Sequence, residues 1–183
     1  MFIILLIAAL MVGAALMVYF RNFSRSYPVI PISKSAVVLT GCSSGIGLCT
    51  AHLLAGRGFL VFAGVRREAD FDIFSTDSIV PVLIDIADSN SIAAAAKFVS
   101  NYLKERHLGK VTLSIVNNAG VGSLSAVQDI DLATLRSVLD VNVVGAVDMV
   151  QQFLPLVVDV DGKYPGRIVN VGSGKHESRS PEV

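Results

Sequence analysis

The sequence predicts an α/β domain with a parallel sheet and helices on both faces, preceded by one apolar helix. Three observations lead to this prediction. Residues 1–20 are apolar except for Gly13, whereas residues 21–183 have an ordinary composition. Within 35–183, short apolar runs alternate with helical patterns, which is typical of parallel sheets. A glycine-rich turn joins the first such run to the first helix.

Composition excludes several classes of protein. The chain has 183 residues, of which 52% are apolar and 16% charged, and its 15 basic and 15 acidic residues cancel. A disordered chain needs lower hydrophobicity and a larger net charge, and a nucleic-acid binder needs a basic surface. Two cysteines cannot form a disulfide scaffold. Neither cysteine has a metal-ligand partner at a useful spacing, and the three histidines are scattered, so we expect no metal site.

The N-terminal segment 1–20 predicts an uncleaved transmembrane anchor. As a helix it would span about 30 Å, the thickness of a bilayer's hydrocarbon core. A cleaved signal peptide is the alternative, but it would have a basic start and a small-residue cleavage site. Arg21 and Arg25 follow the segment, which places the rest of the chain in the cytosol. Residues 21–34, with Pro28 and Pro31, form the expected juxtamembrane linker.

Five strands are expected in the domain 35–183, and three helical patterns lie between them. Pro81 within the third strand suits an edge position, because proline donates no ladder hydrogen bond. Pro155 should bend the end of the last helix. The expected strands are 36–39, 59–65, 79–86, 111–116 and 167–172. The expected helices start at Ile46, at Asp88 or Ser89, and at about Leu132, the last running to about Val158.

Helical periodicity assigns a buried face to each helix. The face of the first helix is Ile46, Cys49, Leu53 and Leu54; that of the second is Ile92, Ala95, Ala96, Val99 and Leu103; that of the third is Leu135, Leu139, Val143, Ala146, Val150 and Phe153. Cys49 is therefore interpreted as a small core residue.

The turn after the first strand carries the first chemical signal. Strand, glycine-rich turn and helix together aim backbone N–H groups and a helix N-terminus at a pyrophosphate. The spacing here is G-x-x-x-G-x-G, which differs from the general dinucleotide fingerprint. A tight turn without a ligand is the alternative. The predicted cofactor-binding residues of this turn are Gly41, Ser43, Ser44, Gly45, Ile46 and Gly47.

The end of the second strand indicates the type of cofactor. An NAD site usually has an acidic residue there for the ribose 2′-hydroxyl. This strand instead ends in Arg66 and Arg67, with no acid before Glu68. Arginine can bind a 2′-phosphate by donating charge-assisted hydrogen bonds to it, which favours NADP over NAD. A solvated strand end is the alternative interpretation.

Five motifs in order resemble the short-chain dehydrogenase/reductase family over about residues 35–173. The glycine-rich turn is similar to the family's cofactor turn, and its Gly-Cys-Ser-Ser-Gly-Ile-Gly form resembles the membrane-anchored retinol and hydroxysteroid dehydrogenases. The other four motifs are Asp85-Ile86, the adenine-contacting pair; Asn117-Asn118-Ala119-Gly120 after the fourth strand; Asn142, the mid-helix active-site asparagine; and 166–173, which places Ser173 at the catalytic serine.

The resemblance implies a Rossmann-type doubly wound sheet and reversible hydride transfer between a nicotinamide and an alcohol or ketone. It assigns Asp85, Ile86, Asn118, Ala119 and Gly120 to cofactor binding. Ser173 would hydrogen-bond the substrate oxygen, and Asn142 would hold a water in a proton relay. It also implies a small apolar substrate (retinoid, steroid or similar), the endoplasmic reticulum membrane as location, and a homo-oligomer in a full-length form.

Each matched residue also has a purely structural interpretation. Ser173 could cap the turn after its strand, and Asn142 could be a helix-bending residue satisfied by neighbouring backbone. Asn117 and Asn118 could be turn formers, and Asp85 a solvated strand end.

The sequence departs from the family after Ser173. The family's Tyr-x-x-x-Lys pair should follow Ser173 by about a dozen residues, but only residues 174–183 remain and they contain no tyrosine. The sheet is therefore expected to be incomplete, with an exposed edge at its fifth strand. Two functions remain open: a membrane-anchored, NADP-preferring oxidoreductase of which this is the N-terminal part, and a catalytically inactive truncated dinucleotide-binding module from splicing or an incomplete gene model.

Overall fold

The fold was analysed in a computed structural model, which describes residues 10–19, 30–106, 108, 111–123, 126, 128–157 and 165–173. The elements of the domain, in order, are η1 (Ile32–Lys34), β1 (Ser35–Leu39), α2 (Gly45–Gly56), β2 (Leu60–Val65), η2 (Glu68–Ile73), β3 (Ile79–Leu83), α3 (Ser89–Glu105), β4 (Thr112–Asn117), α4 (Leu132–Leu139), η3 (Asp140–Gly145), α5 (Ala146–Val157) and β5 (Ile168–Asn170).

The five strands form one parallel sheet in the order β3-β2-β1-β4-β5. This confirms the predicted Rossmann-type sheet. Pro81 lies on β3, the outer strand on one side, where its missing N–H breaks no ladder. The chain crosses outward from β1 to β2 and then returns to the other side of β1 as β4. Ligands of such sheets bind at the carboxyl ends of the strands, where the winding reverses.

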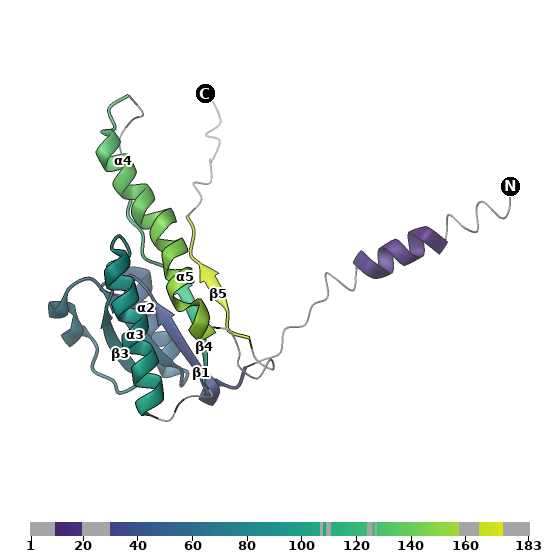
Figure 1. Ribbon diagram of the computed structural model, residues 1–183, viewed down its shortest axis with the longest axis horizontal. Coiled ribbons are helices and arrows are strands. Elements are labelled where there is room, and N and C mark those ends of the chain that lie inside the picture. The colour runs from purple at the N-terminus through teal and green to yellow at the C-terminus, as the bar shows by residue number, and fades with distance from the viewer. Residues whose placement is uncertain are drawn as a thin grey trace, which may run out of the picture.

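Two apolar layers cover the sheet. On one face, α3 and α5 lie side by side (Figure 1). They pack over Val38, Phe62 and Ile115 of the sheet. On the other face, α2 packs with Ala51 over Val37 and Val61. The α3 face matches the prediction, because Ile92, Ala95, Ala96, Val99 and Leu103 are all buried. Asp88 caps this helix by accepting a hydrogen bond from the Asn90 N–H at 2.9 Å.

The predicted inner face of α2 is wrong except for Leu54, which is partly buried against the core. Ile46 is 71% exposed, Leu53 and Cys49 are exposed as well, and the buried residues are Gly47 and Ala51. Apolar side chains occur all round this helix, so their spacing did not single out the side that faces the sheet. The small residues do so, because they let the helix backbone approach the strands closely. Cys49 is therefore not a core residue.

The single helix predicted for 132–158 is instead built from α4, the π-helical turn η3 and α5. Leu135, Leu139 and Val143 are exposed, contrary to the predicted inner face, whereas Phe153 is buried as predicted. Met149 and Val157 are buried as well. A π turn inserts an extra residue, which rotates the helix surface relative to a constant 3.6-residue period. In addition, α4 projects beyond the sheet (Figure 1), so it has no strand to pack against.

The N-terminal prediction is only partly within the described residues. Residues 10–19 form a helix, and residues 1–9 and 20–29, which hold the rest of the expected anchor and much of the linker, lie outside them. None of the described helices combines the length and the apolar composition needed to cross a bilayer.

Candidate cofactor site

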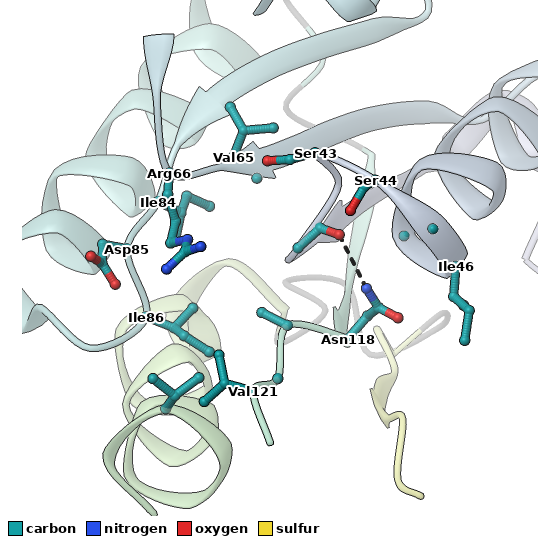
Figure 2. A pocket seen from close by; sticks show the side chains of 17 residues that line it. Ser43, Ser44, Ile46, Val65, Arg66, Ile84, Asp85, Ile86, Asn118 and Val121 are labelled. Atoms are coloured by element: carbon teal, nitrogen blue, oxygen red, sulfur yellow. Dashed lines mark hydrogen bonds between the residues drawn. The ribbon is translucent and has the colours of Figure 1, made fainter. Parts of the chain in front are cut away.

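A pocket of about 370 Å³ lies at the carboxyl ends of β1, β2, β3 and β4. Its size is within the range of small-molecule sites. Figure 2 shows that its walls come from the glycine-rich turn, the ends of β2 and β3, and the segment after β4. The structure places all the predicted cofactor-binding residues on this pocket except Arg67. It also adds residues that the motifs did not indicate: Gly64, Val65, Ile84, Val121 and Val141.

Close backbone packing explains two glycines of the turn. Gly41 has a φ of +73°, and a Cβ there would lie 2.8 Å from the Ala119 Cα. A Cβ on Gly47 would collide with the Gly41 carbonyl oxygen and lie 2.6 Å from the Asn118 Nδ2. The turn therefore folds back on itself and against the segment after β4, and only glycine leaves the space for it.

Thr40 and Asn118 join the turn to the segment after β4. Thr40 is buried, and its Oγ1 accepts hydrogen bonds from the N–H groups of Asn118 and Ala119, at 3.1 and 3.0 Å. The Asn118 side chain donates back to the carbonyl oxygens of Thr40 and Gly41, at 3.0 and 3.4 Å, the latter drawn in Figure 2. These bonds fix the two walls of the pocket relative to one another.

The first turn of α2 faces the pocket. Ser44 occupies the N-cap position, and its side chain makes no capping hydrogen bond. Gly45, Ile46 and Gly47, which follow it, line the pocket. The first N–H groups of a helix have no partner within the helix and attract anions. This end of the pocket can therefore bind a phosphate group without any basic side chain.

The two arginines after β2 differ in their surroundings. Arg66 lines the pocket, and Figure 2 shows its guanidinium reaching in beside Ile84 and Asp85. Arg67 does not line it: its Nη2 lies 2.9 Å from Asp70 Oδ1, and its Nε donates to Asp70 Oδ2 at 3.2 Å. Of the two arginines predicted to bind the cofactor, only Arg66 therefore lines the pocket, because the acid three residues after Arg67 holds Arg67 in an ion pair.

Asp85 and Ile86 line the side of the pocket formed after β3. The Asp85 carboxylate accepts a hydrogen bond from the Ala87 N–H at 3.0 Å, and the backbone N–H of Asp85 donates to Ser91 Oγ at 2.9 Å. The loop is thereby tied to the first turn of α3. Gly145 of η3 packs against the carbonyl of Ile86, where a Cβ would not fit. The position of Ile86 thus depends on the helix that carries Asn142.

Asn142 lies in the π turn, and both ends of its side-chain amide bind the backbone of one residue, Val121. Its Nδ2 donates to the Val121 carbonyl oxygen, and its Oδ1 accepts from the Val121 N–H, both at 2.8 Å. Asn142 therefore holds the segment after β4 in place. Ser173 is exposed, three residues after β5, and does not line the pocket. Among the described residues, Asn142 and Ser173 share no hydrogen bond.

Buried polar groups beside the pocket are structural. Burial raises the pKa of the Cys42 thiol to about 12, and its Sγ lies 3.1 Å from the Leu39 carbonyl oxygen. A thiol with this pKa carries almost no thiolate at neutral pH, so Cys42 is no nucleophile. The described residues contain no cluster of His, Cys, Asp or Glu that could hold a metal ion.

The residues of the pocket fit a dinucleotide. A Cβ on Gly45 would meet nothing within 4 Å, so this side of the pocket has room for a phosphate, and the start of α2 supplies the donors. The residues that the motifs missed have a simple signal in retrospect: Gly64, Val65 and Ile84 end or follow strands β2 and β3, where ligands of such sheets bind. Val141 gives no such signal, because it belongs to η3 and only the tertiary packing of this segment brings it to the pocket.

Comparison with known proteins agrees with this geometry. Residues 35–183 match the family model described as short chain dehydrogenase. The chain is 32% identical over 160 residues to bovine mitochondrial D-beta-hydroxybutyrate dehydrogenase, covering 84% of this chain and 44% of the relative. It is 36% identical over 154 residues to human 17-beta-hydroxysteroid dehydrogenase type 1, covering 78% and 44%. The chain thus spans less than half the length of these curated relatives.

Solved structures give the same result. A short chain dehydrogenase from Burkholderia cenocepacia in complex with NADP superposes with a TM-score of 0.63 at 27% identity, over 77% of this chain and 54% of that one. NADPH-bound carbonyl reductase from chicken fatty liver gives a TM-score of 0.59 at 29% identity, over 68% and 48%. The match over most of the chain, the parallel sheet and the glycine-lined pocket lead to one conclusion: this protein belongs to the short-chain dehydrogenase family.

Proposed function

We propose that this chain forms the nucleotide-binding part of an oxidoreductase that uses NADP in preference to NAD. The observation that carries the proposal is the pocket at the reversal of the sheet, which has a glycine-lined helix start at one end and Arg66 at the other. The bound nicotinamide would supply or accept the hydride. The residues of the chain would bind the cofactor, orient it and exclude water from it.

The proposed roles of the residues combine their places in the structure with the resemblance to the family. The turn from Gly41 to Gly47 and the start of α2 would hold the pyrophosphate. Arg66 would pair with the 2′-phosphate, and Asp85 would contact the adenine. Asn118 and Asn142 would fix the segment after β4 that forms the far wall. Ser173 would donate a hydrogen bond to the substrate oxygen.

We propose a lipid-like alcohol or ketone, such as a retinoid or steroid, as the substrate. The support is the apolar wall formed by Val121 and Val141, together with the hydroxysteroid dehydrogenases among the relatives. NADP-dependent retention of a labelled steroid or retinol by the purified chain tests this. Retention of D-beta-hydroxybutyrate instead, the substrate named for another relative, would contradict it.

We further propose that residues 1–20 attach the protein to the endoplasmic reticulum membrane, with the domain on the cytosolic side. The apolar composition of this segment and the arginines after it support the proposal. The chain should float with lipid vesicles after an alkaline wash, and a variant that starts at residue 30 should not. Flotation of both chains, or of neither, would contradict the proposal.

Nucleotide binding is the direct test of the cofactor. Adenosine 2′,5′-bisphosphate and adenosine 5′-monophosphate probe the adenosine half of the pocket and differ only in the 2′-phosphate. Calorimetry on the full 183-residue chain should show the bisphosphate binding about tenfold more tightly, since a charge-assisted hydrogen bond contributes about 1.5–3 kcal/mol. Arg66→Ala should abolish the difference. Failure of the chain to bind either probe would refute the proposal.

A further inference from the structure

The carboxylate of Asp70 is placed against the pocket wall without lining the pocket. Asp70 belongs to η2, the turn after β2, and its side chain is 12% exposed, whereas that of its partner Arg67 is 75% exposed. Both Asp70 oxygens bind the same guanidinium, at 2.9 and 3.2 Å. A two-bond pair of this kind fixes the direction of Arg67, which would otherwise be a long side chain free to turn.

Three groups near the expected 2′-phosphate interact with this carboxylate. The Arg67 guanidinium holds the pKa of Asp70 below its usual range, and the Ser43 side chain and the charge of Arg66 add to that effect. Ser43 and Arg66 both line the pocket. The backbone ties these segments together, since the Cys42 N–H donates to the Gly64 carbonyl oxygen at 2.9 Å. Asp70 therefore remains ionised at neutral pH beside the residues predicted to meet the cofactor.

The structure leaves one of two adjacent arginines in the pocket. Of the residues that line it in the described part of the chain, Arg66 is the only basic one. Resting on the proposed function, we propose that Asp70 is a specificity-determining residue for the cofactor. By holding Arg67 in an ion pair, it limits the 2′-phosphate site to one cation and so keeps the preference for NADP over NAD moderate.

Charge balance gives the direction of the effect. A 2′-phosphate carries more than one negative charge and is attracted by each unpaired guanidinium nearby. Without the carboxylate of Asp70, Arg67 loses its ion pair, and its uncompensated positive charge lies next to Arg66 in the chain. Without the guanidinium of Arg67, the Asp70 carboxylate is uncompensated beside Ser43 and repels the phosphate. Removal of both leaves the net charge of the region as it is now.

The test is a double-mutant cycle on the full chain. The probes are adenosine 2′,5′-bisphosphate and adenosine 5′-monophosphate, and the readout is the ratio of their dissociation constants. Asp70→Asn should raise the preference for the bisphosphate about tenfold, and Arg67→Gln should lower it by a similar factor. The double variant should return close to the original ratio. Asp72→Asn is the matched control, because it removes an exposed carboxylate of the same turn that does not pair with Arg67.

The ratio distinguishes specificity from a structural role. If Asp70 only stabilised the turn η2, its loss would weaken both probes alike and leave the ratio unchanged, which would overturn the inference. An equal change of the ratio in Asp72→Asn would also overturn the inference, since the effect would then come from the net charge of the region rather than from the pair with Arg67. If Asp70→Asn fails to fold, Arg67→Gln and the double variant still decide. Binding of neither probe by the original chain refutes the proposed function, whereas binding of both with an unmoved ratio refutes only this inference.

Discussion

At the scale of single residues, the cofactor pocket depends on glycines that allow close packing and on polar side chains that hydrogen-bond to the chain's own backbone. Gly47 brings the start of α2 onto the Gly41 carbonyl, and Thr40 uses its hydroxyl on two N–H groups of the facing segment. Asn142 uses both ends of its amide on Val121. The motif residues therefore build the walls of the pocket before they touch any ligand.

Gly47→Ala should destabilise the domain and abolish nucleotide binding. The added methyl group would collide with the Gly41 carbonyl oxygen, which has no room to move because the turn is tied to Asn118. Overpacking of this kind costs about 1–3 kcal/mol of the free energy of unfolding. Urea unfolding and calorimetric binding measure both effects. Gly56→Ala is the control in the same helix, because a Cβ there meets nothing within 4 Å; an equal loss in both variants would contradict the explanation.

At the scale of elements, the helix N-termini differ in how their free N–H groups are satisfied. Asp88 caps α3, and Asp131 caps α4 by accepting from the Thr134 N–H at 3.0 Å. In contrast, the cap of α2 is left open toward the pocket. The π turn η3 between α4 and α5 has a different task, since it brings Gly145 against the carbonyl of Ile86 and thereby positions one wall of the pocket.

The cap of α4 predicts a pH dependence. The hydrogen bond from the Thr134 N–H is the largest of the causes that lower the pKa of Asp131 below its ordinary 3.8. A carboxyl group whose pKa is lowered by folding stabilises the native state above its ordinary pKa, and this stabilisation is lost as the pH falls through the lowered value. Thermal midpoints of Asp131→Asn should therefore lie below those of the original chain at pH 7.

The same gap should begin to narrow below about pH 4 and should close once the pH falls below the lowered pKa of Asp131 in the folded chain. Asp129→Asn, which removes a nearby exposed carboxylate that caps no helix, is the control. A gap between the original chain and Asp131→Asn that stays constant from pH 7 to pH 3 would show that the cap does not depend on the ionised carboxylate.

At the scale of the whole molecule, the sheet is covered unevenly. The centre of β1 and β2 is buried on both faces, whereas all three residues of β5 are exposed. In the strand order of the described residues, β5 is the outer strand beside β4, as Figure 1 shows. An exposed apolar edge offers unpaired backbone groups to another chain.

Val169→Lys should reduce self-association of the 183-residue chain. Val169 is the central residue of β5 and is 47% exposed, so a lysine there has room and places a charge on the open edge. Light scattering coupled to size exclusion should show less aggregate at equal concentration. Ala94→Lys adds the same charge on the exposed side of α3 and serves as the control. Equal improvement in both variants would attribute association to net charge rather than to the edge.

The sequence alone determined the elements that repeat a simple period or a short motif. The strands, their parallel arrangement, the buried face of α3 and the pocket-lining positions of the glycine-rich turn follow from local patterns of apolar residues and glycines. Such patterns are reliable because neighbours in the chain are also neighbours in an element.

Tertiary structure decided what depends on neighbours distant in sequence. The face that α2 buries was set by where the backbone can approach the sheet, and the exposure of Leu135 and Leu139 by α4 projecting past the strands. The separation of Arg66 from Arg67 was decided in the same way. Identical side chains stand side by side in the sequence, but the turn η2 places the Asp70 carboxylate so that it pairs with Arg67, whereas Arg66 lines the pocket.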